Sequence, residues 1–326
     1  MNDDGKQLSN PFSTGGGGPG FENQVQTAFV VLMLAGGTAP CLPAWPIRKI
    51  KLQGRYAGYN TDDFIAFIED PNSGRKAKLL AQIKHGVRIT ENDPTFSDVI
   101  RAAWADFQSP EIFDPMSDVI ALISGPLSAN DVENTRTILE WARHTENADD
   151  FFTQVNLAKF SSEGKQNKLQ AFREQLNKAN NGKNLTEDQL YRFLRSFHIL
   201  GYDLDVKSGV ALSLLLSLIA QYTNNSASDL WAVVSREVSS FNQNAGTITL
   251  ETVSREIRIA FSQRQRHATI PAELATPPEA ESHVPRDEHL KGEKGDSLMY
   301  ASLLGAWNDQ VEGDRAVIRE LIEGDD

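Results

Sequence analysis

Five polar residues in the first hundred positions could together support the hydrolysis of a phosphodiester bond. Asp62 and Asp63 open one short apolar run, and Gln82 and Lys84 lie at the end of the next. Side chains two apart on a strand share a face, so Gln82 and Lys84 should project together. Glu22 lies one position off the apolar stripe of a preceding helical segment and could reach the same point.

This combination of side chains suits Mg²⁺, with Mn²⁺ as a possible substitute. Mg²⁺ prefers oxygen ligands, usually one or two carboxylates with water and substrate phosphate. Asp63 or Asp62, depending on strand register, would supply the fixed charge, and Gln82 a further oxygen. Lys84 would orient water or stabilise developing charge, and Glu22 would bind the metal through water or assist a proton transfer. We assign catalysis to Glu22, Asp63, Gln82 and Lys84, and metal binding to Asp63, Asp62, Gln82 and Glu22.

Each of these residues also has an ordinary structural interpretation. Lys84 alone would be a solvated lysine, Asp62-Asp63 a strand entry, and Glu22 a surface helix residue. Gln82 is less ordinary, because a buried amide without partners costs on the order of 1–3 kcal/mol. The ordered set, rather than any single member, indicates a site.

Hydrophobic periodicity predicts the elements that would position these residues. Apolar residues recur at helical spacing over 21–32, and Gly36-Gly37 should end that helix. The runs 47–52, 63–69 and 78–84 predict strands, the last two joined by a turn at 70–74. A helix starting at Asp93-Pro94 and a strand over 119–123 follow. The predicted order is helix, three strands, helix, strand.

From about residue 130 the pattern becomes helical. Thr186 and Gln189 should form a capping box, and further helices are expected near 208–222, 228–241 and 250–262. We expect an α/β core, a mixed sheet flanked by helices, followed by an all-helical domain. The expected divisions are a disordered leader at 1–19, the α/β domain at 20–130, the helical domain at 131–270, a linker at 271–296 rich in proline, glutamate and lysine, and a C-terminal helix at 297–326 leading into a further region.

The net charge of −12 is unevenly distributed. Residues 1–110 hold eleven Lys/Arg and eleven Asp/Glu, so the excess of acid lies beyond them. The segment 48–88 holds nine basic and four acidic residues, which favours phosphate binding, although a solvated charged face is the alternative. The candidate DNA contacts are Arg48, Lys49, Lys51, Arg55, Lys76, Lys78 and Arg88.

Cysteine content and apolar runs exclude several classes. Cys41 is the single cysteine, which rules out an internal disulfide and a multi-cysteine metal site. The longest apolar runs, 29–35 and 210–220, are shorter than the ~20 residues of a membrane span. No signal peptide is visible. We expect a cytoplasmic protein without a membrane partner.

The stretch 17–106 resembles PD-(D/E)XK-type double-stranded DNA nucleases. The resemblance rests on Gly-Pro-Gly-Phe-Glu-Asn at 18–23, Thr-Asp-Asp-Phe at 61–64, Gln-Ile-Lys-His at 82–85 and Phe96 with Trp104-Ala-Asp-Phe107. It implies a restriction-endonuclease-like core that cuts double-stranded DNA. The family's metal-binding aspartate falls on Asp63 or Asp62, its Glu/Gln position on Gln82, its lysine on Lys84 and its helix-borne acid on Glu22. Gln82 replaces the commoner acid and removes one formal charge.

More narrowly, the chain is similar to the nuclease effector domains at the N-terminus of bacterial antiphage STAND NTPases and related defence endonucleases. That resemblance implies a downstream P-loop ATPase and sensor, and self-association on activation. No Walker motif occurs in these 326 residues. The segment 198–205 resembles a helical region that follows the nuclease in such proteins.

Two other classes of function fit the same sequence. One is a nucleic-acid-binding module of the same fold without catalysis, favoured by Gln82 and the acidic balance. The other is a helical oligomerisation or adaptor protein built on residues 130–265, whose apolar stripes would be buried against other helices.

Overall fold

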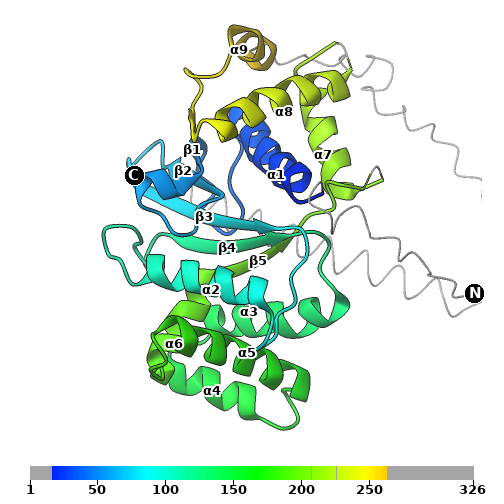
Figure 1. Cartoon of the computed structure of the whole chain (residues 1–326). Helices are drawn as coiled ribbons and strands as arrows, with labels where there is room; N and C mark the ends of the chain where they lie inside the picture. Colours follow the sequence, from blue (N-terminus) through cyan, green and yellow to red (C-terminus); the bar gives the residue numbers. More distant parts are fainter. Residues whose placement is uncertain (1–16, 207, 225, 263–326) are drawn as a thin grey trace, which may run out of the picture. The chain divides into compact units, whose positions relative to one another are not determined.

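A six-stranded mixed sheet organises the part of the chain that the structure, a computed structural model, describes: residues 17–206, 208–224 and 226–262 (Figure 1). The spatial order of the strands is β5-β4-β3-β2-β1-β6. The strands are β1 (Ile47–Leu52), β2 (Phe64–Glu69), β3 (Lys76–Lys84), β4 (Val119–Ser124), β5 (Phe197–Gly201) and β6 (Thr247–Ile248). Pairing is antiparallel for β6–β1, β1–β2 and β2–β3, and parallel for β3–β4 and β4–β5.

Helices cover both faces of this sheet (Figure 1). One face carries α1 (Gly17–Leu34), α7 (Val210–Ile219) and α8 (Ala227–Gln243), and α9 (Arg255–Ser262) lies next to α8. The other face carries α2 (Pro94–Phe107), the π-helical turn η2 (Asp131–Arg136), α3 (Thr137–His144), α4 (Ala148–Asn156), α5 (Glu163–Ala179) and α6 (Glu187–Ser196).

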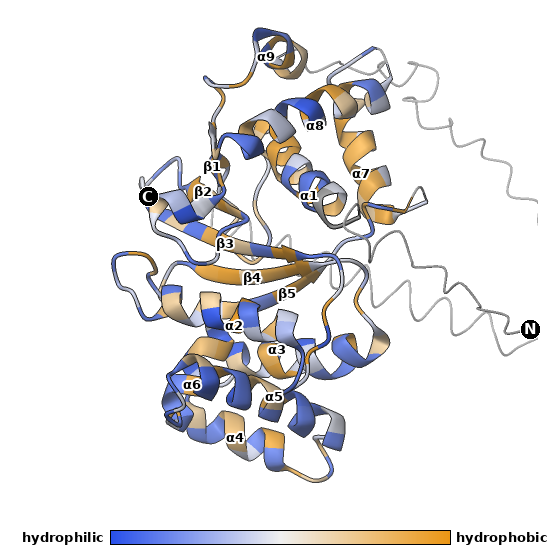
Figure 2. Ribbon diagram, in the orientation of Figure 1, coloured by the Kyte–Doolittle hydropathy of each residue, from blue (hydrophilic) through white to orange (hydrophobic). Residues whose placement is uncertain are grey.

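Alternation along the strands divides the apolar residues between two cores. In β2, Phe64 and Ala66 belong to the core under α1, whereas Ile65 belongs to the core under α2. In β3, Ala81 faces α1 and Leu80 faces α2. The strands are therefore apolar on both faces, as sheets covered by two helical layers require. Figure 2 shows this hydrophobic character most clearly along β4.

The predicted order of helix, three strands, helix and strand is confirmed for residues 17–124. Asp93 caps α2, since its Oδ1 accepts a hydrogen bond from the backbone N–H of Phe96 at 2.8 Å, and Pro94 occupies the first turn. The capping box of α6 also forms, with reciprocal bonds between Thr186 and Gln189. Local signals of this kind determine where helices begin because they act within one turn.

The prediction of an all-helical domain after residue 130 is wrong. Residues 197–201, expected within a helical region, form β5 parallel to β4, and Thr247–Ile248 pairs with β1. Residues 17–262 accordingly belong to one compact unit with no division at 130. The segment Phe197–Gly201 follows α6 directly and could be taken for its continuation, but it pairs with the edge of β4 as a strand.

Three predicted segments lie wholly or mostly outside the described residues. These are the leader at 1–19, the linker at 271–296 and the C-terminal helix at 297–326. At the leader's end, residues 17–19 already belong to the first turn of α1. Among the described helices, none has both the length and the apolar character needed to cross a membrane.

We predict that a fragment ending at residue 130 does not fold by itself. It would lack β5, which covers the edge of β4, and α8, which packs on α1, so core residues such as Phe29 and Ile123 would lose apolar neighbours. Urea unfolding followed by far-ultraviolet circular dichroism should show no cooperative transition for residues 1–130 and a clear one for the full chain. A cooperative transition in the fragment would contradict this prediction.

Candidate functional site

The predicted site residues of β2 and β3 meet at one end of the sheet. β2 and β3 are antiparallel with Phe64 opposite Ala81, so Asp63 lies beside Gln82. Asp63, Gln82 and Lys84 have the same strand parity as Ile65 and Leu80, which places them on the face that α2 covers. The register therefore distinguishes Asp63 from Asp62 as the partner of the β3 side chains.

Asp63 is the centre of this cluster. Its Oδ2 accepts a hydrogen bond from Nε2 of Gln82 at 2.9 Å and another from the backbone N–H of Ile83. Nζ of Lys84 lies 3.6 Å from the same oxygen. Asp63 and Gln82 are each only 8% exposed. The buried amide group of Gln82 thus donates a hydrogen bond to the carboxylate, which offsets the free-energy cost of burying this amide.

These residues line a cleft of about 470 Å³ between the sheet and α2. Asp62 lies in the same cleft, where its Oδ2 is 3.1 Å from Nε of Arg55. Arg55 belongs to the short 3-10 helix η1 (Gly54–Ala57) between β1 and β2. From α2, Asp98 and Arg101 complete the polar lining. With Asn60, the cleft therefore offers three carboxylates, two side-chain amides, an ammonium group and two guanidinium groups.

The environment of Asp63 raises the pKa of its carboxyl group from the ordinary value of 3.8 to about 6. Burial is the main cause, because it penalises the charged form. The Lys84 ammonium and the Ile83 N–H oppose that effect, and the negative charges of Glu22 and Asp62 add to it. A carboxyl group shifted by burial in a polar cleft is typical of functional sites.

A buried carboxylate on α2 fixes the loop that delivers Asp62 and Asp63. Asp106, fully buried, accepts hydrogen bonds from the backbone N–H groups of Asn60 and Thr61 at 2.8 and 2.6 Å. It also accepts one from the Asn60 side chain at 2.9 Å. The sequence showed Asp106 within the motif after Trp104 but gave it no role.

Glu22 does not line this cleft. It projects from α1, on the opposite face of the sheet, and its Oε1 accepts hydrogen bonds from three side-chain amides. One donor, Nε2 of Gln26, also lies 3.1 Å from the backbone oxygen of Asp63. Glu22 is therefore coupled to Asp63 through this amide and through charge repulsion, rather than by sharing its cleft.

The cleft fits Mg²⁺ in its donor chemistry, although among residues 17–262 no group of three or more His, Cys, Asp or Glu side chains could hold a metal ion. Mg²⁺ usually takes only one or two protein carboxylates. Asp63 and Asp62 supply these, and Gln82 supplies an amide oxygen. Oδ1 of Asp63 and Oε1 of Gln82 take part in no hydrogen bond within the described chain, so both can serve as ligands.

The predicted basic surface is only partly assembled at the cleft. Of the seven candidate DNA contacts, Arg55 lines it. Lys78 instead forms an ion pair with Asp118 at 2.8 Å, and Lys76 lies 3.7 Å from Glu69. Nine residues of β3 span roughly 26 Å between Lys76 and Lys84, so neither Lys76 nor Lys78 can contact a phosphate bound in this cleft.

The other candidate DNA contacts are distributed along β1 and beyond β3. Nζ of Lys51 donates to the backbone oxygen of Ala245, and Nζ of Lys49 lies 4.0 Å from the centre of the Phe67 ring. Arg48, in β1, and Arg88, after β3, are exposed. A charge count along the sequence misses this separation, because an extended strand rises about 3.3 Å per residue and so carries Lys76 and Lys84 to opposite ends of β3.

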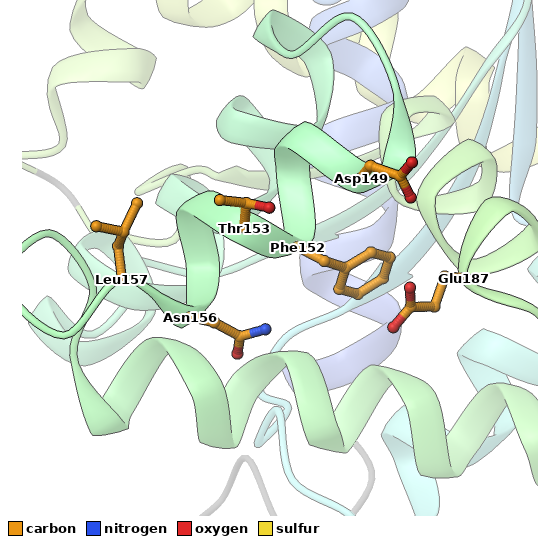
Figure 3. A pocket seen from close by; sticks show the side chains of 6 residues that line it. All are labelled: Asp149, Phe152, Thr153, Asn156, Leu157 and Glu187. Atoms are coloured by element: carbon orange, nitrogen blue, oxygen red, sulfur yellow. The ribbon is translucent and has the colours of Figure 1, made fainter.

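Two further polar features do not extend the candidate site. His85, which follows Lys84, pairs through Nε2 with Oδ2 of Asp205 at 2.9 Å. A hollow of about 540 Å³ on the helical layer contains Asp149 and Glu187 around Phe152 (Figure 3). None of the sequence-predicted residues lines that hollow.

Comparison with known proteins gives little further information. No family model and no curated protein matches the sequence. Two solved structures of an Acinetobacter baumannii Cap4 SAVED/CARF-domain containing receptor, one with the cyclic trinucleotide 3'3'3'-cAAA, align with TM-scores of 0.40 and 0.41 at 13% and 12% identity. The alignments cover 75% of this chain and 46% of those chains.

We predict that Asp63→Asn stabilises the protein at neutral and alkaline pH. The folded state raises the pKa of Asp63, so ionising it opposes folding as the pH rises from about 4 to above 6. A displacement from 3.8 to about 6 corresponds to about 3 kcal/mol, and we expect a gain of roughly 2–3 kcal/mol at pH 8.

The measurement is the free energy of unfolding of both proteins in urea between pH 4 and pH 8. The difference should be small at pH 4, where the wild-type carboxyl group is protonated, and should grow through pH 6. A difference independent of pH would show that ionisation of Asp63 does not oppose folding.

Proposed function

We propose that this chain is a Mg²⁺-dependent endonuclease that hydrolyses phosphodiester bonds of double-stranded DNA on a restriction-endonuclease-like core. The observation that carries the proposal is the buried Asp63 carboxylate, joined on one face of the sheet by Gln82 and Lys84 in an open cleft. The residue types, their order in the chain and their placement on β2 and β3 agree with the motif that the sequence resembles.

Each side chain has a definite task in this proposal. Asp63 and Gln82 would hold the divalent cation, with Asp62 as a second carboxylate once a substrate phosphate draws Arg55 away. The bound ion supplies Lewis acidity towards the phosphate and the attacking water. Lys84 would orient that water and donate to the negative charge that develops on the phosphate oxygens. Arg55 and Arg101, at the cleft, would position the DNA backbone.

The biological setting that we propose follows from the narrower sequence resemblance. The nuclease would be the cytoplasmic effector part of a bacterial antiviral defence protein, activated by self-association under the control of downstream NTPase and sensor regions. A catalytically inactive DNA-binding module, or a helical adaptor, is the alternative that the cleavage experiment separates.

We predict that the protein degrades plasmid DNA with Mg²⁺ or Mn²⁺ and that Asp63→Asn and Lys84→Ala each reduce the rate on the order of 100-fold or more. The rates are measured by gel electrophoresis at fixed salt, with the protein also tested in a cross-linked, self-associated form. Lys159→Ala, a change of an exposed lysine in the loop after α4, is the matched control and should retain full activity. Full activity in both site variants would exclude the proposed site, and metal-independent binding without cleavage would favour the inactive module.

We also predict that the cleavage rate at limiting Mg²⁺ rises with pH through about 6. A protonated Asp63 cannot bind the cation, and its pKa is raised to about 6. Because Mg²⁺ competes with the proton, a higher Mg²⁺ concentration should move the midpoint to lower pH. Rate–pH profiles at two Mg²⁺ concentrations measure this shift, and a midpoint that ignores Mg²⁺ would contradict the linkage.

A further inference from the structure

Three side-chain amides from three different elements converge on one oxygen of Glu22. Oε1 accepts hydrogen bonds from Gln26 of α1 at 3.0 Å, from Gln53 after β1 at 3.3 Å and from Asn242 of α8 at 3.2 Å. Oε2 of Glu22 takes part in no hydrogen bond among the described residues. The network therefore fixes the carboxylate through one oxygen and leaves the other available.

Asn242 connects this network in both directions. Its Nδ2 donates to Glu22, and its Oδ1 accepts from Gln53 at 3.0 Å and from Gln26 at 3.3 Å. Turning the amide over would place its NH₂ group against two donors and its oxygen against a carboxylate, so the neighbours determine its orientation. Asn242 lies 220 positions from Glu22 in the chain, yet it is one of the groups that orient it.

Gln53 reaches the network from an unfavourable backbone conformation. Its φ and ψ of 49° and 62° lie in the left-handed region, which costs a non-glycine residue roughly 1 kcal/mol or more. Its backbone N–H points to the backbone oxygen of Asp63, the same atom that Gln26 contacts. A glycine would adopt this backbone conformation at lower cost, so the side-chain hydrogen bonds of Gln53 explain why a glutamine occupies the position.

We infer that Asn242 and Gln53 are positioning residues that hold the Glu22 carboxylate beside the loop at Asp63, so that its negative charge acts on a divalent cation bound there and α8 forms part of the nuclease. This inference rests on the proposed function, since it gives the charge of Glu22 a role in attracting the cation to Asp63. It also assigns a site role to the part of the chain that its sequence pattern describes only as helical. Gln26 links the two acids, because its one NH₂ group contacts both Glu22 and the loop at Asp63.

The test is a double-mutant cycle on Mn²⁺ binding, measured by electron paramagnetic resonance for the wild type, Asn242→Leu, Glu22→Gln and the double variant. We expect Asn242→Leu to weaken Mn²⁺ binding about 10-fold, as expected for a lost hydrogen bond to a charged group. In the Glu22→Gln background the same change should weaken binding less than about 2-fold. Gln243→Leu, an exposed neighbour on α8 without contact to Glu22, is the control and should bind Mn²⁺ as the wild type does.

Gln53→Gly separates positioning from general stability. This change relieves the left-handed backbone, so the melting temperature should remain within a few degrees of the wild type, while Mn²⁺ binding weakens about as much as in Asn242→Leu. The positioning role would be overturned if Asn242→Leu weakened Mn²⁺ binding equally in the wild type and in Glu22→Gln. It would also be overturned if Asn242→Leu and Gln53→Gly both bound Mn²⁺ as tightly as the wild type.

DNA cleavage by the same proteins distinguishes the two proposals. If Asn242 and Glu22 are coupled in Mn²⁺ binding but the wild type cuts no DNA, the positioning role holds and the nuclease proposal fails. If the wild type cuts DNA in a manner that requires Asp63 but the coupling is absent, the nuclease proposal holds and the positioning role is overturned.

Discussion

Burial of the Asp63 carboxylate is the constraint on which the site depends. A carboxylate that is 8% exposed is costly unless it is compensated by hydrogen bonds and opposite charge. Here Gln82, the Ile83 N–H and Lys84 provide part of that compensation from one strand. They do not provide all of it, because the pKa of Asp63 remains raised to about 6. A divalent cation would supply the missing positive charge, which links the cost of folding to metal binding.

The sheet makes this arrangement possible because it is covered on both faces. The layer containing α2 provides Asp106, which holds the loop before Asp62. The layer containing α1 and α8 provides Glu22 and its amide donors. The helical layer on each face of the sheet thus contributes one network of hydrogen bonds to a carboxylate. Asp62 and Asp63, directly before β2, lie between these two networks. A rigid two-layer scaffold of this kind is what a precisely oriented cation site requires.

Long-range packing also explains why the chain cannot be divided at residue 130. The helices after that point do not form a separate body, since β5 covers the edge of β4 and α8 packs on α1. Any change in the position of α8 would move Asn242 and thereby Glu22. Contacts that stabilise the fold and contacts that orient the proposed site are therefore partly the same.

The sequence by itself determined the elements whose signals are local. The N-cap at Asp93, the apolar runs of β2 and β3 and the turn between them each act over a few residues, so the helices and strands up to residue 124 follow from signals of this kind. The capping box at Thr186 determines the start of α6 in the same way. The common face of Gln82 and Lys84 follows from the alternation of side chains along a strand.

Only the tertiary structure decided the features that need partners far away in the chain. The register of β2 against β3 places Asp63, rather than Asp62, beside Gln82. Residues 197–201 form a strand because they pair with the edge of β4. Asn242 donates a hydrogen bond to Glu22, which lies 220 positions away in the chain. The physical reason is common to all of these: pairing and packing depend on which surfaces meet after folding, and local sequence patterns contain no record of that.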